Sequence, residues 1–158
     1  MRTRRLAPAT LALALLVLAG SLAACTPGVS AVDHARQMIG TRYTYGGASP
    51  SEGFDCSGLT SWAWNKAGVD EIPRTSSAQH AWATPISRSE LQPGDLVFYS
   101  AGGPEGTVSH VSLYAGEDKL IQAPNRDRNV EEVSIDSYWT SNLVGYGRIP
   151  ASAMPESS

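Results

Sequence analysis

Two side chains in this sequence have the types and positions needed for nucleophilic catalysis. Cys56 follows Asp55 at the predicted start of a helix, where unpaired backbone N–H groups and the helix dipole favour an anion. His110 begins a predicted strand, which would hold its ring as a general base for a thiol. This pattern predicts a Cys56 thiolate whose pKa is below that of a free thiol, about 8.5. The alternative for Cys56 is a small apolar residue of the core.

Hairpin geometry nominates a third residue, Gln122. Alternation along a strand places His110 and Ser112 on the same face. If residues 116–118 form a three-residue loop, Ser112 lies opposite Gln122, and Gln122 lies diagonal to His110, within side-chain reach. A two-residue loop would place Gln122 on the other face. In the first arrangement its Oε1 accepts from one ring nitrogen and leaves the other facing Cys56. The alternative is a polar side chain satisfied within the sheet.

The elements that would position these residues are helices in the first half of the chain and strands in the second. Val32, Ala35 and Ile39 recur at helical spacing before Gly40, and a second helix starts at Asp55 and ends at Gly68. Five runs predict strands, at residues 95–100, 110–115, 120–123, 130–135 and 143–149. Helices followed by strands indicate an α+β fold with an antiparallel sheet of about five strands.

The first 24 residues have the pattern of a bacterial export signal. Three arginines in residues 1–5 precede an apolar run over residues 6–20, and small residues precede Cys25. The apolar run is shorter than the roughly 20 residues that a spanning helix needs. The ending Leu-Ala-Ala-Cys resembles a lipobox, which implies lipid on Cys25 and an exported protein anchored at a bacterial membrane, facing the cell wall. An ordinary secretory signal with a chance cysteine is the alternative.

These patterns divide the chain into a signal (1–24), a short linker (25–30), one domain (31–150) and a disordered tail (151–158). We expect a monomer. Loss of the signal would leave nine of the 12 basic residues against 15 acidic ones, so that the net charge changes from −3 to −6. A domain this acidic is not expected to bind nucleic acid. If Cys25 is lipidated, Cys56 has no disulfide partner, and catalysis is the leading reason to retain a free thiol.

Six ordered blocks of sequence resemble the NlpC-type cell-wall cysteine peptidases. They are residues 43–47, 53–59, 73–76, 91–99, 109–116 and 120–124. The resemblance covers about residues 31 to 150. It implies a papain-like α+β fold and hydrolysis of peptidoglycan stem peptides, usually between γ-D-glutamate and a diamino acid. It also implies that Cys56 is the nucleophile, His110 the base, residue 122 the orienting group, and Tyr43 a residue near the oxyanion site.

Other residues of these blocks are weaker candidates for contact with the oxyanion or the substrate. They are Asp55, Ser57, Arg74 and Ser76. Asp55 has the alternative of a helix N-cap with no further role, and Arg74 that of a surface charge. The third catalytic position is often His in the family and is Gln122 here; papain-like enzymes accept an amide at this place.

Two other functions remain open from the sequence. One is a non-catalytic lipoprotein that binds cell wall or regulates a partner, although such proteins usually lose the Cys or the His that this chain keeps. The other is amidase or acyl-transfer chemistry on the same fold. His34 and His80 form no metal-ligand pattern, so that neither a metal nor another cofactor is expected.

Overall fold

The computed structural model describes residues 26–137 and 140–155. These residues contain three helices and eight strands. The helices are α1 (Pro27–Gln37), α2 (Cys56–Lys66) and α3 (Ser76–Trp82). The strands are β1 (Ala48–Ser49), β2 (Gly53–Phe54), β3 (Thr84–Ile86), β4 (Leu96–Tyr99), β5 (His110–Gly116), β6 (Lys119–Gln122), β7 (Glu131–Ser134) and β8 (Leu143–Arg148). Short 3-10 turns lie at Arg88–Glu90, Thr140–Asn142 and Ala151–Ala153.

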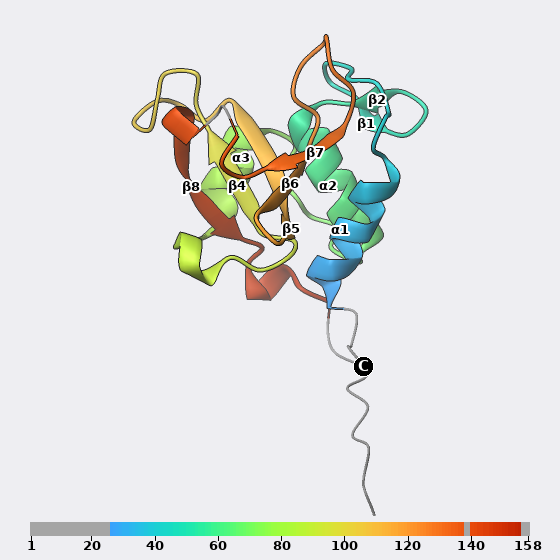
Figure 1. The fold of residues 1–158 in the computed structure, drawn as a ribbon. Coiled ribbons are helices and arrows are strands. Elements are labelled where there is room, and N and C mark those ends of the chain that lie inside the picture. The colour runs from blue at the N-terminus through green and yellow to red at the C-terminus, as the bar shows by residue number, and fades with distance from the viewer. Residues whose placement is uncertain (1–25, 138–139, 156–158) are drawn as a thin grey trace, which may run out of the picture.

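Six of the strands form one antiparallel sheet in the order β3-β8-β4-β5-β6-β7, and β1 and β2 form a separate small hairpin. Helices α1 and α2 lie side by side next to β5 and β6 (Figure 1). The predicted α+β fold with an antiparallel sheet is confirmed. The sheet has six strands rather than about five because β3, three residues with a central proline, is too short to show an alternating pattern.

The core has two parts, one on each face of the sheet. Apolar residues of α1 and α2 pack against Leu96 and Phe98 of β4 and against Val111 and Leu113 of β5. A smaller cluster on the opposite face is built around Tyr99 and its neighbours. Alternating side chains of β4 therefore enter both clusters, and β4 is buried on both faces.

The predicted linker is wrong, because helix α1 begins inside it. Thr26 is the N-cap, and its side chain accepts a hydrogen bond from the Val29 N–H at 3.4 Å. Pro27 follows at the first helical position, where a missing N–H costs nothing. The helix ends at Gln37, so that Ile39 lies beyond it and is 45% exposed instead of packing on its apolar face.

The predicted disordered tail is also wrong for the residues that the structure describes. Residues 151–153 form a 3-10 turn, and Ala153 and Met154 pack against the core. The described fold therefore begins at residue 26 and reaches residue 155. The predictions of an export signal and of lipid on Cys25 lie outside the described residues. Among the described helices, none has the length and apolar character needed to cross a membrane.

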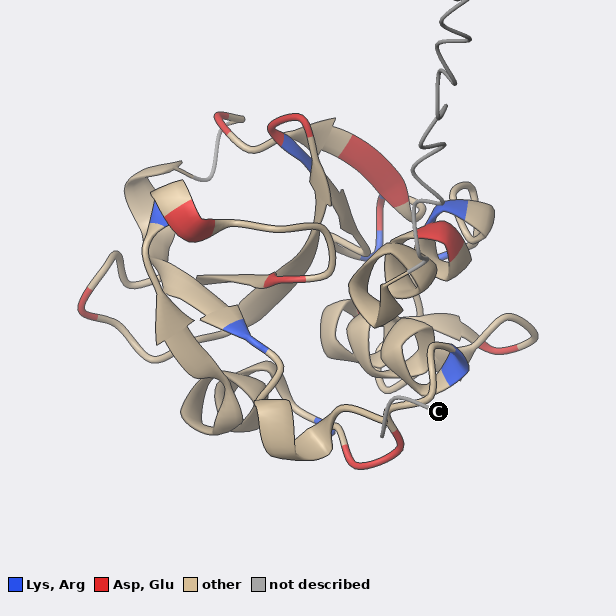
Figure 2. Ribbon diagram, turned by 90° about the horizontal axis from the view of Figure 1, so that it is seen from below, with Lys and Arg blue, Asp and Glu red and all other residues tan. Residues whose placement is uncertain are grey.

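Charged residues are dispersed around this fold, at loops and at the ends of elements (Figure 2). Several form ion pairs that connect distant segments. Arg36 of α1 pairs with Glu132 of β7 at 3.2 Å, and Arg148 of β8 pairs with the buried Asp95 at 2.7 Å. In the view of Figure 2, the basic positions are separated from one another along the ribbon and lie among acidic ones.

Candidate active site

Cys56 is the first residue of α2, and Asp55 is its N-cap, as the sequence predicted. The Asp55 carboxylate accepts from the Gly58 N–H at 2.7 Å. The partly buried Cys56 thiol is hydrogen-bonded to the backbone of Val111. Because Val111 directly follows His110 in β5, the thiol lies beside the start of the strand that carries the predicted base.

A close backbone approach fixes the loop that faces the first turn of α2. A Cβ placed on Gly58 would lie 2.0 Å from the carbonyl oxygen of Gly47, so that only glycine allows this contact. The Gly46 N–H in turn donates to Asp55 at 2.9 Å. The loop that follows Tyr43 is therefore held against α2 by Asp55, the residue directly before Cys56.

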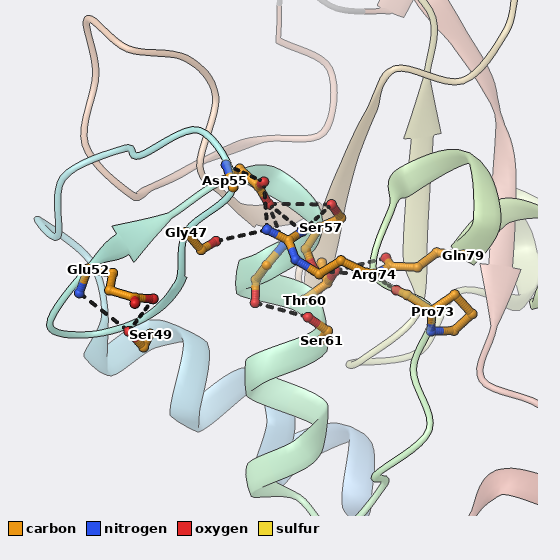
Figure 3. A network of polar contacts seen from close by, with 12 residues as sticks. Gly47, Ser49, Glu52, Asp55, Ser57, Thr60, Ser61, Pro73, Arg74 and Gln79 are labelled. Carbon is orange, nitrogen blue, oxygen red and sulfur yellow. Dashed lines mark hydrogen bonds and ion pairs between the residues drawn. The ribbon is translucent and has the colours of Figure 1, made fainter.

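Arg74 completes a polar network around Asp55 (Figure 3). Its guanidinium donates to both carboxylate oxygens of Asp55, at 2.9 and 2.8 Å, a bidentate arrangement. It also donates to the Ser57 hydroxyl at 3.1 Å and to the Gly47 carbonyl at 3.4 Å. Since the Asp55 oxygens are occupied by these donors, the structure favours the positioning role of Asp55. The Arg74 side chain, 43% exposed, still borders the cleft beside Cys56.

A fully buried glutamine holds the segment that carries Arg74. Gln79 of α3 donates to the carbonyl oxygens of Pro73 and Ser57, at 2.9 and 3.1 Å, and accepts from the Thr60 hydroxyl at 2.8 Å (Figure 3). All of these partners are buried or partly buried. Helix α3 is therefore connected both to α2 and to the Arg74 segment. Sequence reasoning missed this residue because its partners lie 6 to 22 residues away.

His110 and Gln122 are in contact, although the hairpin between them is neither of the two considered from sequence. The turn has two residues, Glu117 and Asp118, with φ of 51° and 53°. A bulge between Tyr114 and Gly116 adds one residue on β5 and restores the register that pairs Leu113 with Ile121. Gln122 therefore shares a face with His110, and its Oε1 lies 2.9 Å from His110 Nε2.

Two further residues contact this amide. The Ser112 hydroxyl donates to Gln122 Oε1 at 3.0 Å, and the Gln122 Nε2 donates to Glu131 at 3.1 Å. Glu131 was not identified from sequence. Its signal was the register of β6 and β7, which places it directly opposite Gln122.

An open cleft of about 410 Å³ brings most of the predicted site residues together. Its lining includes Tyr43, Asp55, Cys56, Ser57, Arg74 and Ser76. Ser109, next to His110, lines it as well, and so does Tyr45, which is 79% exposed and was not singled out from sequence. In the described ranges, no group of three His, Cys, Asp or Glu side chains could hold a metal ion.

Burial changes the ionisation expected at this site. It raises the pKa of the Cys56 thiol, and the Asp55 carboxylate adds to the rise, while hydrogen bonds from the backbone at Val111 and Ser57 oppose it. Burial lowers the pKa of His110, and the hydrogen bond to Gln122 opposes that shift in part. The direction of the Cys56 shift is opposite to the low-pKa thiolate that the sequence predicted. Both shifts favour the neutral form of the group concerned, a thiol at Cys56 and an imidazole at His110.

The alkylation rate of Cys56 as a function of pH measures the pKa of its thiol. Because the pKa of the thiol is raised, the rate with iodoacetamide should increase with pH through an inflection above about 8.5, the value of a free thiol. A Cys25→Ser chain makes Cys56 the sole reactive thiol, and a small-molecule thiol gives the matched reference. An inflection clearly below the reference would restore the low-pKa thiolate.

Comparison with known proteins identifies the family of this chain. The family described as NlpC/P60 matches residues 40–148. The chain belongs to the NlpC/P60 family. Among curated relatives, it is 41% identical over 122 residues to the murein DD-endopeptidase MepH of Escherichia coli, covering 75% of this chain and 45% of that protein. It is 34% identical over 131 residues to the gamma-DL-glutamyl hydrolase of Bacillus subtilis, covering 83% of this chain and 32% of that protein.

Solved structures agree with the family assignment. A crystal structure of an NlpC/P60 family protein from Bacillus cereus superimposes with a TM-score of 0.74 at 30% identity, covering 78% of this chain and 41% of the other. This NlpC/P60 chain spans less than half the length of the two curated relatives, which carry further segments that the match does not include.

Proposed function

We propose that this NlpC/P60 chain is a cysteine peptidase that hydrolyses peptidoglycan stem peptides. The observation that carries the proposal is the position of Cys56, at the first turn of α2 and beside the start of β5, where His110 is hydrogen-bonded to Gln122. The relatives named as endopeptidases and as a glutamyl hydrolase support the class of substrate.

In the proposed reaction, His110 takes the proton of the Cys56 thiol as the sulfur attacks the carbonyl carbon of the scissile amide. The Cys56 backbone N–H and the Tyr43 hydroxyl stabilise the oxyanion that forms. When the C–N bond breaks, His110 donates that proton to the leaving amine, and a thioester remains on Cys56. A water molecule, deprotonated by His110, then hydrolyses the thioester and regenerates the thiol.

The proposed scissile bond joins γ-D-glutamate to a diamino acid. The relatives support two different specificities, because one is named a DD-endopeptidase and another a gamma-DL-glutamyl hydrolase. Mass spectrometry of the products from intact peptidoglycan and from a short stem peptide distinguishes these two specificities. A new diamino-acid N-terminus after D-glutamate is expected, with Cys56→Ala as the inactive control. Cleavage only between two D-residues of a cross-link, or only between the sugar and the first alanine, would contradict the proposed bond.

We further propose that lipid on Cys25 anchors the chain at a bacterial membrane with the cleft directed away from it. Only Thr26 separates Cys25 from α1, a helix of 11 residues and about 16 Å. Helix α1 begins at the bottom of Figure 1, whereas α2 begins near the β1–β2 hairpin at the top. The site therefore lies at the end of the domain opposite to the start of α1.

Replacement of Cys25 with serine is expected to move the protein from the membrane fraction to the soluble fraction. Hydrolysis by the purified domain should not change, because α1, the first helix after residue 25 in the sequence, begins at the end of the domain opposite to the cleft. Immunoblots of fractionated cells that express each form test the prediction. A wild-type protein that is mainly soluble, or a Cys25→Ser form that stays with the membrane, would contradict lipid anchoring through this residue.

A further inference from the structure

The Gln122 amide lies between His110 and Glu131, with its oxygen toward the imidazole and its nitrogen toward the carboxylate. The Oε1–Nε2 distance to His110 is 2.9 Å, and the Nε2–Oε1 distance to Glu131 is 3.1 Å. His110 and Gln122 are only 5% and 2% exposed. Hydrogen bonds in such a buried place are costly to leave unmade, so the direction of each one matters.

Two of the groups around the amide are compatible with either of its orientations. The Ser112 hydroxyl, 3.0 Å from Gln122 Oε1, can donate or accept. A neutral imidazole nitrogen is a donor in one tautomer and an acceptor in the other. If the amide were turned over, its NH2 group could therefore donate to His110 and to Ser112. Neither contact decides the orientation.

Glu131 does decide it, because an ionised carboxylate only accepts hydrogen bonds. Its second oxygen forms an ion pair with Arg128. Turning the amide over would place Gln122 Oε1 against the carboxylate, an unfavourable contact between two acceptors. The Gln122 nitrogen is therefore held toward Glu131, and its oxygen toward His110.

We infer that Glu131 is a positioning residue that selects which nitrogen of His110 acts as the base. An amide oxygen only accepts, so His110 Nε2 must carry the ring proton. Nδ1 is then the unprotonated nitrogen, the one that takes the thiol proton in the proposed reaction. The inference rests on the proposed function for its catalytic consequence, but the tautomer itself is a property of the substrate-free protein.

The Glu131→Gln variant is expected to reverse this selection. Arg128 favours the oxygen of the new amide, which turns the amide nitrogen of residue 131 toward Gln122. Gln122 would then present its oxygen to residue 131 and its NH2 group to His110, which favours the Nδ1–H tautomer. The two ¹⁵N shifts of His110 report the tautomer directly. We expect a dominant Nε2–H form in the wild type, a marked gain of Nδ1–H in Glu131→Gln, and a kcat about tenfold lower with little change in KM.

Two variants separate this role from a general effect on the sheet. Glu132→Gln makes the same change at the adjacent residue of β7, which forms a comparable ion pair with Arg36, and it should leave the tautomer unchanged. In the double variant Gln122→Glu/Glu131→Gln, the carboxylate at residue 122 again accepts a hydrogen bond from His110, and the amide at residue 131 donates to that carboxylate. This variant should restore the Nε2–H tautomer of His110. An unchanged tautomer in Glu131→Gln, an equal shift in Glu132→Gln, or no restoration by the double variant would overturn the inference. If the shifts behave as expected but no variant hydrolyses peptidoglycan, the proposed function fails and the positioning role stands.

Discussion

Replacement of His110 with alanine is expected to lower kcat/KM at pH 7 by about 10²- to 10⁴-fold, the range typical of a positioned general acid–base. The loss is large because burial keeps the pKa of the Cys56 thiol high, so that few thiolates form without the imidazole. His34→Ala is the matched control, since His34 lies in α1 and contacts Trp62 outside the cleft.

The pH profile of the His110→Ala variant makes this prediction specific. Without the base, activity should follow the thiolate fraction and rise about tenfold per pH unit until the thiol pKa is reached. The wild type should lose activity only as His110 becomes protonated, below about 6.5, because burial lowers the pKa of this imidazole. If the variant and the wild type have parallel profiles of activity against pH, or if kcat/KM at pH 7 is unchanged in the variant, His110 is not the base.

Replacement of Asp55 with alanine is expected to destabilise the domain by about 2 kcal/mol and to reduce hydrolysis strongly. The variant loses the N-cap of α2, which is worth about 0.5–2 kcal/mol, and leaves Arg74 and the Gly46 N–H without their carboxylate. Arg74 is 43% exposed, so water compensates part of the lost ion pair. Activity falls because the loop after Tyr43 and the first turn of α2 are no longer held together.

Urea denaturation and hydrolysis of a stem peptide measure the two effects. Asp55→Asn separates the contributions, because asparagine caps a helix as well as aspartate but cannot form the bidentate ion pair. Asp33→Ala is the control for an exposed aspartate with an ion pair within its own helix, and it should change stability by less than about 0.5 kcal/mol. If the free energy of unfolding of Asp55→Ala also lies within about 0.5 kcal/mol of the wild-type value, Asp55 does not hold this network together.

The features of the fold and of the site that could be predicted from sequence depend on local pattern. The cap at Asp55 and the alternation of Val111 and Leu113 require only the residues next to them, and the structure confirms both. The start of α1 also has a local signal in the sequence. Thr26 followed by Pro27 is a helix-start pattern, and it contradicts the linker expected after the signal.

The parts that could not be predicted depend on contacts between distant segments. The bidentate pair of Arg74 with Asp55 joins residues 19 apart, and neither has a partner dictated by spacing. Gln122 meets His110 only because a bulge and a two-residue turn together set the register of β5 and β6. Glu131 meets Gln122 through the separate register of β6 and β7. The pKa of Cys56 depends on burial, which a helix-start pattern does not contain.

Intact-protein mass spectrometry can detect the covalent acyl intermediate that we propose forms on Cys56. The chain is mixed with a stem peptide, quenched in acid within the first turnovers, and digested to locate any adduct. We expect an added mass equal to the acyl half of the substrate on the peptide that contains Cys56, and neither adduct nor product with the Cys56→Ala chain. Hydrolysis of the stem peptide by Cys56→Ala at the wild-type rate would contradict the proposed intermediate.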